Sequence, residues 1–334
     1  MTSSAHLVDI PENPVPSGGD AFWLQGFDGK PLRAALWPAT VAAPRGTVLL
    51  FGGRTEFIEK YCETIGLLRA RGFAVAMLDW RGQGLSVRET DNPLRGHIDS
   101  FADFDRDLAE FLKAVAARGL PAPFVGLAHS MGGHIVLRWL YWADSAAPLA
   151  AGVPRMVAAV LAAPMVALAM GEPAMLAMRG LCFSAIALGF GKRYLPGGSD
   201  KQALDNDTFE GNLVTSDKRR FARQAALVTA EPALNLAAPT FGWGGAAAES
   251  MDWLHTDTVI RGITTPVLLC GASEDKVVST PAVAAYARHL PNARYMACEG
   301  ARHEIMMERD ALQEPFWHAF DAFIDEVASD ATSS

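Results

Sequence analysis

Short continuous runs of apolar residues alternate along this chain with longer segments in which apolar residues recur every three or four positions. The first pattern predicts buried β-strands, and the second predicts amphipathic α-helices. The predicted strands span residues 21–26, 32–37, 47–51, 73–78, the run that follows Pro123, 156–162, 266–270 and 293–298. The first two are expected to form a hairpin that turns at Asp28-Gly29. Such an alternation is typical of an α/β fold with a mostly parallel central sheet and helices on both faces.

The alternation stops between about residues 166 and 260, in a stretch rich in Met, Ala and Gly. It resumes afterwards, with a helix that begins at Ser279-Thr280-Pro281 and a last helix that carries Phe316 and Phe320. We interpret the middle stretch as a largely helical cap inserted into one sheet. The chain is therefore divided into an extended or disordered lead-in (1–20), the first part of a core (21–165), the inserted cap (166–260) and the second part of the core (261–334).

The composition excludes several classes of function. Apolar residues make up 50% of the chain and charged residues 20%, and the net charge is -8, so there is no concentrated basic surface of the kind that nucleic-acid binding needs. The four cysteines show no zinc-binding spacing, and we expect no metal site. The first residues lack the pattern of a secretory signal, and the longest apolar stretch, Met156 to Met170, is shorter than the roughly 20 residues of a spanning helix. The expected location is the cytoplasm.

The strand after Pro123 ends in the motif Ala128-His-Ser-Met-Gly132, and a pattern of helical spacing follows it. A serine on such a strand-turn-helix corner has its hydroxyl held above the sheet, where it can act as a nucleophile. The motif usually carries glycine at the position of Ala128, and one extra methyl group still allows the turn to close. The alternative is that Ser130 only caps the following helix.

A serine hydroxyl becomes a nucleophile when a neighbouring imidazole removes its proton and an acid orients the imidazole. Functional groups of open α/β sheets lie at the carboxyl ends of strands, so the candidates are residues just past a strand. Asp275 follows the strand 266–270 and His303 follows the strand 293–298, with Glu274 as a rival for the acid. The chain order Ser130, Asp275, His303 is the order that goes with the α/β-hydrolase fold.

Acyl transfer also needs N–H donors for the negatively charged oxygen of the tetrahedral intermediate, the oxyanion hole. One donor is expected from Met131, the residue after the nucleophile. The second is expected from the loop after the strand 47–51, where Gly52-Gly53 allow the backbone to turn tightly, and we assign it to Arg54. The same two glycines would also serve a simple strand-to-helix turn.

Taken together, these motifs resemble the α/β-hydrolases of the monoacylglycerol lipase and bacterial lysophospholipase group, which are serine hydrolases. The resemblance covers nearly the whole chain after the lead-in. It rests on Gly52-Gly-Arg-Thr-Glu56 with Tyr61, Asp79-Trp-Arg-Gly-Gln-Gly84 with Ser86, Ala128-His-Ser-Met-Gly-Gly133, Ala163-Pro-Met165, Pro239-Thr-Phe-Gly-Trp243, Glu274-Asp-Lys-Val-Val278 and Gly300-Ala-Arg-His-Glu-Ile305. The lipase branch would carry His-Gly where Gly52-Gly53 stand, so the oxyanion loop looks like the lysophospholipase version.

The resemblance implies a catalytic triad of Ser130, His303 and Asp275, with no metal and no cofactor. It also implies a helical cap that forms the acyl-chain pocket, and a small-molecule lipid ester, either lysophospholipid or monoacylglycerol, as the substrate. Substrate contacts are expected at Gly53, His129, Met165 and Trp243. The methionines of the cap fit an adaptable apolar pocket, or they fill the core of the cap itself.

Several alternatives stay open. The triad fits thioester, amide or peptide cleavage and acyl transfer equally well, and a non-catalytic receptor or scaffold with the same fold is a further alternative. A basic cluster, formed by Lys218, Arg219, Arg220 and Arg223, either attracts a phosphate head group or an anionic membrane surface, or is a solvated helix face. The sequence does not determine the oligomeric state, or whether the cap makes transient contact with a membrane and places the protein at the periphery of the inner membrane.

Overall fold

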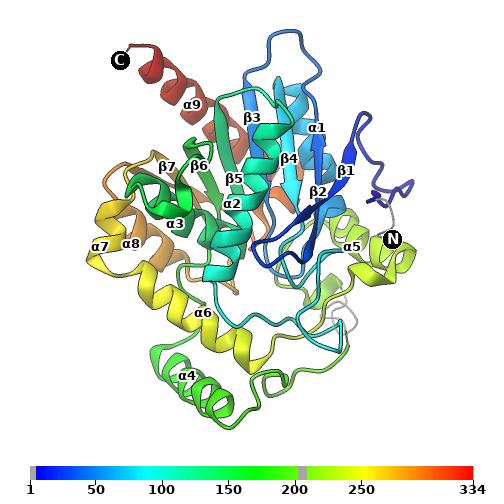
Figure 1. The fold of residues 1–334 in the computed structure, drawn as a ribbon, viewed down its shortest axis with the longest axis vertical. Helices are drawn as coiled ribbons and strands as arrows, with labels where there is room; N and C mark the ends of the chain where they lie inside the picture. The colour runs from blue at the N-terminus through cyan, green and yellow to red at the C-terminus, as the bar shows by residue number, and fades with distance from the viewer. Residues whose placement is uncertain (1–4, 202–208, 334) are drawn as a thin grey trace.

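One eight-stranded sheet forms the centre of the computed structural model, which describes residues 5–201 and 209–333 (Figure 1). The strand order is β1-β2-β4-β3-β5-β6-β7-β8. The contacts β1/β2 and β2/β4 are antiparallel and all others are parallel. The strands are β1 (Asp20–Gln25), β2 (Pro31–Trp37), β3 (Gly46–Phe51), β4 (Phe73–Leu78), β5 (Phe124–His129), β6 (Met156–Ala162), β7 (Val267–Ala272) and β8 (Ala293–Cys298). Every predicted strand is present, and β4, β6 and β8 have the predicted bounds.

Helices cover both faces of the sheet, as the alternation predicted. They are α1 (Cys62–Ala70), α2 (Ala102–Ala117), α3 (Met131–Asp144), α4 (Glu172–Ala187), α5 (Lys218–Ala230), α6 (Phe241–Leu254), α7 (Asp257–Gly262), α8 (Thr280–His289) and α9 (Asp310–Ser333). After β3 the chain runs through a loop, and a 3-10 turn (Ile58–Tyr61) then leads into α1.

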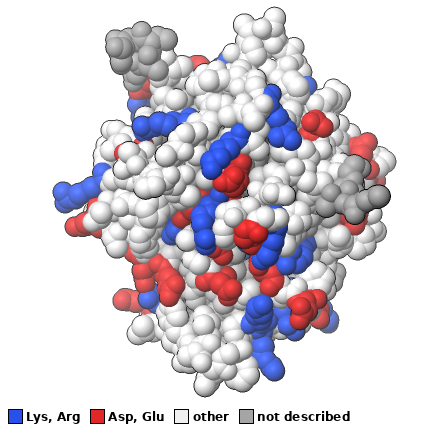
Figure 2. Space-filling model, in the orientation of Figure 1, with Lys and Arg blue, Asp and Glu red and all other residues white. Residues whose placement is uncertain are grey.

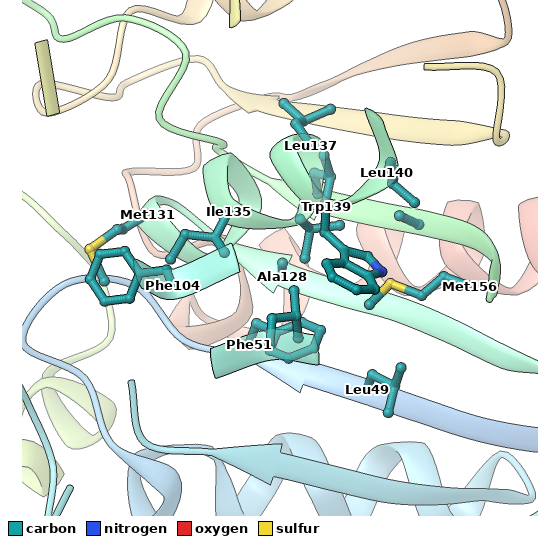
Figure 3. Close-up of a cluster of buried hydrophobic side chains, with 14 of the residues drawn as sticks. Leu49, Phe51, Phe104, Ala128, Met131, Ile135, Leu137, Trp139, Leu140 and Met156 are labelled. Carbon is teal, nitrogen blue, oxygen red and sulfur yellow. The ribbon is translucent and has the colours of Figure 1, made fainter. Parts of the chain in front are cut away.

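The sheet separates two hydrophobic cores because successive side chains of a strand point to opposite faces. In β3, Leu49 and Phe51 belong to the core shared with α2, α3 and α8. Val48 and Leu50 belong to the core shared with α1 and α9. Figure 3 shows part of the first core, where Leu49 and Phe51 lie on the side of the sheet that α3 covers. Burial on both faces explains why the central strands β3 to β7 are continuous apolar runs in the sequence.

The segment between β6 and β7 carries α4, α5, α6 and α7, and its described part contains no strand of the sheet. Glycines of α6 allow α4 to approach closely: a Cβ at Gly244 would lie 2.9 Å from Cys182 Sγ, and one at Gly245 would lie 2.7 Å from Ile186 Cδ1. The opposite side of α4 faces away from the molecule (Figure 1). That this segment acts as a cap, with the limits predicted above, stays a prediction.

In the described ranges, no helix combines the length and the apolar character that crossing a bilayer requires.

Candidate active site

Ser130 occupies a strained corner between β5 and α3. Its backbone angles are φ 50 and ψ -115, in a region that residues with a side chain seldom adopt. Its N–H donates to the carbonyl of Ala162 at 3.0 Å, which ties the corner to the end of β6. The turn also needs glycine at position 132, because a Cβ there would lie 2.6 Å from the carbonyl oxygen of Gly52. The corner therefore packs directly against the loop after β3.

The side chains of Ser130, His303 and Asp275 form one hydrogen-bonded chain at the carboxyl ends of β5, β8 and β7. His303 Nδ1 lies 2.7 Å from Asp275 Oδ2, and His303 Nε2 lies 2.9 Å from Ser130 Oγ. Because a carboxylate accepts only, Nδ1 carries the proton, and the serine hydroxyl donates to Nε2. This is the tautomer in which the imidazole can accept the hydroxyl proton.

The acid that contacts His303 is Asp275 and not its rival Glu274, whose side chain is exposed. Burial would raise the pKa of Asp275. The hydrogen bond and charge of His303, together with the N–H groups of Val277 and Val278, outweigh burial and hold the pKa of Asp275 below its usual value. Asp275 is therefore an anion near neutral pH.

The two expected oxyanion donors, the backbone N–H groups of Arg54 and Met131, lie on either side of this corner. Both residues line the cavity that contains Ser130. Within residues 5–201 and 209–333, neither N–H donates to another group. The N–H of Gly53, in contrast, donates to the carboxylate of Glu56. The arrangement leaves the N–H groups of Arg54 and Met131 available to a substrate oxygen, and their role stays a prediction.

The loop that carries Arg54 is held in place by the motif that follows β4. Trp80 Nε1 donates to the carbonyl of Gly52 at 2.9 Å, and Gln83 Nε2 donates to the carbonyl of Gly53 at 2.7 Å. The sequence showed this motif only as part of a resemblance. This structural role could have been expected from Trp80 and Gln83, because an indole N–H and a side-chain amide need hydrogen-bond partners when they are buried.

His129 lies beside the triad and uses both ring nitrogens. Nδ1 lies 3.0 Å from Glu56 Oε2, and Nε2 lies 3.2 Å from the carbonyl oxygen of His303. Both partners are acceptors, so both nitrogens carry protons. Burial would lower the pKa of His129, but the charge of Glu56 outweighs it and raises that pKa. His129 thus links the loop of Glu56 to the loop of His303, a contact that the sequence did not predict.

The Glu56 carboxylate belongs to a compact set of buried charges. Lys60 Nζ lies 2.8 Å from Glu56 Oε1 and 2.6 Å from Glu304 Oε1, and the Tyr61 hydroxyl donates to Glu56 Oε2 at 2.6 Å. Burial would raise the pKa of Glu56, whereas Lys60 and His129 lower it, and the net pKa lies well below the usual value. The negative charges of both glutamates are therefore compensated inside this cluster.

A cavity of about 200 Å³ opens above Ser130. Met165 and Trp243, two of the expected substrate contacts, line it together with His129, whereas Gly53 does not. Leu168, Val214 and Trp243 bring the segment between β6 and β7 to its wall, which is how that segment reaches the site. Contact of these residues with substrate stays a prediction. Among the described residues, no group of three or more His, Cys, Asp or Glu is arranged to hold a metal ion.

The basic cluster of Lys218, Arg219, Arg220 and Arg223 is not a set of free cations. Arg220 and Arg223 are buried and both contact the carboxylate of Glu63. None of these four residues lines the cavity that contains Ser130. Two of the four charges of the cluster are thus engaged in the attachment of α5 to α1. Lys218 and Arg219 are exposed, and Arg219 Nη2 lies 3.8 Å from Glu63 Oε1.

A mostly parallel sheet with a strained serine at the end of β5, hydrogen-bonded to a histidine after β8 and through it to an aspartate after β7, defines an α/β-hydrolase. Residues 42–310 match the family described as serine aminopeptidase, S33. The chain belongs to this family. The predicted fold class and the resemblance to the lysophospholipase and monoacylglycerol lipase group are confirmed by these matches and by the relatives that follow.

Lysophospholipase L2 of Escherichia coli (strain K12) is 30% identical over 321 residues, which cover 91% of this chain and 89% of that protein. Phospholipase YtpA of Bacillus subtilis (strain 168) is 25% identical over 297 residues, which cover 87% of this chain and 99% of that protein. A soluble variant of monoglyceride lipase from Saccharomyces cerevisiae, solved with a substrate analogue, superposes with a TM-score of 0.69 at 19% identity and covers 93% of this chain and 97% of that one. This last likeness shows the shared fold.

Proposed function

We propose that this protein is a serine hydrolase that cleaves the carboxylic ester of a lipid, either a lysophospholipid or a monoacylglycerol, through an acyl-enzyme on Ser130. The observation that carries the proposal is the hydrogen-bonded chain from Ser130 through His303 to Asp275, with Ser130 and His303 at the wall of a cavity. The names of the curated relatives support a lipid ester as the substrate.

In the proposed mechanism, Ser130 Oγ attacks the ester carbonyl carbon while His303 Nε2 takes the hydroxyl proton. The carbonyl electron pair moves onto its oxygen, which the N–H groups of Arg54 and Met131 bind. When the intermediate collapses, the bond to the alcohol breaks and the alcohol leaves with the proton from His303. Water, deprotonated by His303, then attacks the carbonyl carbon of the acyl-enzyme. The bond to Ser130 Oγ breaks, His303 returns the proton to Oγ, and the fatty acid is released.

Peptide cleavage, which the family description suggests, is favoured less by the charges around the cavity. An aminopeptidase must bind the free ammonium group of its substrate, and an unpaired carboxylate is the usual means. Among the residues that the structure describes, two carboxylates line this cavity, those of Glu56 and Glu304, and both are paired with Lys60. A substrate ammonium would therefore enter without a free partner, whereas an acyl chain needs none.

Purified enzyme is expected to hydrolyse lysophospholipids and monoacylglycerols with kcat/KM at least about 100-fold above that for aminoacyl p-nitroanilides, because a site without a free carboxylate rejects an ammonium group. The measurement is steady-state kinetics on a panel that also contains fatty acyl thioesters and, as acceptors, added alcohols. Faster cleavage of the anilides would contradict the proposal in favour of a peptidase, and dominant thioester cleavage or transfer to alcohols would redirect it to those reactions.

We also propose that the segment between β6 and β7 is a cap whose helix α4 touches a lipid surface. Large apolar side chains are exposed along and after this helix, including Leu176 at 70% and Leu188 at 71% exposure. Figure 2 shows mostly uncharged surface at the end of the molecule where α4 lies in Figure 1. Exposed Lys192 and Arg193 follow directly along the chain, and they complement anionic lipid.

The double change Leu176→Glu with Leu188→Glu is expected to lower binding to phosphatidylglycerol-containing vesicles by roughly tenfold or more, because each exposed leucine contributes about 1.5–3 kcal/mol when it leaves water. Vesicle co-sedimentation measures this. Val41→Glu is the matched control, since Val41 is also exposed but lies in the loop between β2 and β3. Equal sedimentation of the wild type, the double variant and the control would rule out the contact.

A further inference from the structure

The guanidinium of Arg54 lies at the wall of the same cavity as Ser130 and has few partners. Nη2 donates to the carbonyl of Ala237 at 2.5 Å, and the guanidinium carbon lies 5.4 Å from the centre of the Trp243 ring. Nε is buried and has no hydrogen-bond partner in the described part of the chain. A guanidinium has five N–H donors, so most of the donor capacity of Arg54 is unused.

No described carboxylate compensates the charge of Arg54, whereas each arginine that is buried in full has a carboxylate partner. Arg33, for example, pairs with Glu59 and Asp79. Burial lowers the pKa of Arg54 to about 10, so the side chain is still a cation at neutral pH. A cation removed from water without a counter-ion is unfavourable, and an anion that enters the cavity would relieve this cost.

Arg88 shows how this protein satisfies an arginine that has no carboxylate and no ligand to bind. Its two Nη atoms donate to four backbone carbonyls, at residues 82, 84, 233 and 235. Arg88 does not line the cavity. Arg95, which also lies outside the cavity, has a buried Nε without a partner in the described part of the chain, as Arg54 has. Arg54 differs from both arginines because it lines the cavity of Ser130.

The structure also keeps a place for the Arg54 side chain. A Cβ at Gly96 would lie 2.5 Å from Arg54 Nη2, so a larger residue at this position would displace the guanidinium from where it lies. The nearby acids of the cavity, Glu56 and Glu304, are occupied by Lys60. Arg54 is therefore held against Trp243 and Gly96, on the cavity wall, without an internal partner that would neutralise it.

We propose that the guanidinium of Arg54 binds the phosphate of the substrate head group and makes the enzyme prefer anionic lysophospholipids to neutral monoacylglycerols. This inference rests on the proposed function and chooses between its two substrate classes. In a lysophospholipid only a glycerol unit separates the reacting ester from the phosphate. One residue can therefore contact both groups, with its backbone N–H at the ester oxygen and its side chain at the phosphate. A phosphodiester or phosphomonoester accepts the paired N–H donors of arginine in a fixed geometry.

The test compares Arg54→Gln and Arg54→Lys with the wild type, on lysophosphatidylglycerol and monoacylglycerol of the same acyl chain in the same neutral detergent. Arg54→Gln is expected to lower the ratio of the two kcat/KM values by about tenfold or more, mainly through KM of the phospholipid, since hydrogen bonds to charged groups have such effects. Arg54→Lys keeps the charge but not the paired donors. Its ratio of the two kcat/KM values is expected to lie between that of the wild type and that of Arg54→Gln.

Arg261→Gln is the matched control. It removes one positive charge from the segment between β6 and β7, which also supplies Trp243, but Arg261 is exposed and does not line the cavity. The ratio of the two kcat/KM values in Arg261→Gln is expected to equal that of the wild type. An unchanged ratio in Arg54→Gln, or an equal fall in Arg261→Gln that disappears with added salt, would overturn the proposal, because the preference would then come from the general field of the protein.

A second measurement needs no variant and decides the question if Arg54→Gln does not fold. Hydrolysis of a short p-nitrophenyl ester by the wild type is followed with added glycerol 3-phosphate, glycerol or inorganic phosphate at constant ionic strength. Competitive inhibition by glycerol 3-phosphate, stronger than by inorganic phosphate and absent with glycerol, supports a head-group site. Equal inhibition by inorganic phosphate indicates a free-phosphate site, and no inhibition indicates no anion site, so either result overturns the proposal.

These results also separate this inference from the proposed function. An enzyme that hydrolyses both lipids without a preference retains the proposed function and loses the role of Arg54. An enzyme that hydrolyses neither lipid loses the proposed function, and the head-group site with it.

Discussion

Replacement of Ser130 by alanine is expected to lower kcat for ester hydrolysis by about a million-fold, the scale seen when the nucleophile of a serine triad is removed. The reason is that the alanine variant has no oxygen that can form the acyl-enzyme, so neither of the two steps proceeds through His303. What activity remains comes from the oxyanion donors and from substrate binding alone. Hydrolysis of a p-nitrophenyl ester and covalent labelling by a fluorophosphonate measure the loss.

The chain offers a matched control in a second buried serine that contacts a histidine. Ser250 Oγ lies 2.6 Å from His134 Nε2, and neither residue lines the cavity. Burial lowers the pKa of His134 to about 3, so this imidazole is a weak base. The Ser250→Ala variant is expected to react with the fluorophosphonate to the same extent as the wild type. Labelling that persists in Ser130→Ala, or that is absent in folded wild type, would contradict the assignment of the nucleophile.

Replacement of Asp275 by asparagine is expected to lower kcat by about 10⁴-fold, as for the orienting acid of other serine triads. An amide of the same shape has no negative charge to stabilise the imidazolium that forms when His303 takes the serine proton. Its NH2 group can also donate to Nδ1, which would place the histidine proton on Nε2, where it blocks the acceptor for Ser130. The measurement is kcat for the p-nitrophenyl ester at fixed pH.

Glu274→Gln is the control for Asp275, because Glu274 was the rival acid in the sequence and is exposed in the structure. This variant is expected to keep kcat within about twofold of the wild type, as surface substitutions do. Circular dichroism of both variants shows whether they fold. Comparable losses in the two variants would mean that the carboxylate in contact with His303 is not the one that orients it.

The central strands β3 to β7 were predictable because each is almost wholly buried on both faces, which requires a continuous apolar run of a length that the sequence displays. Their order was not predictable in the same way. The position of β3 between β4 and β5 depends on backbone hydrogen bonds that have no sequence signature. That order places the end of β3 beside the end of β5, and so brings the loop of Arg54 against Ser130.

The three residues of the triad were predictable from chain order and from their positions just past predicted strands. His303 and Ser130 are 173 positions apart, yet the carboxyl ends of parallel strands meet at one edge of the sheet. The support around them was not predictable. The contacts of His129 with Glu56 and with the carbonyl of His303 join two loops to the end of β5, and neither loop shows its partner in its own sequence.

By itself the sequence determined the strands and helices, the interrupted middle segment and the residue types that can perform acyl transfer, because apolar spacing and local motifs are properties of neighbouring residues. The tertiary structure alone decided which charges are free. Arg220, in a conspicuous basic cluster, is neutralised by Glu63 at a distance of 157 positions along the chain. Arg54, which attracted attention only for its backbone N–H, has no described carboxylate partner. Whether a charge is paired depends on residues far away in sequence and on the water that folding removes.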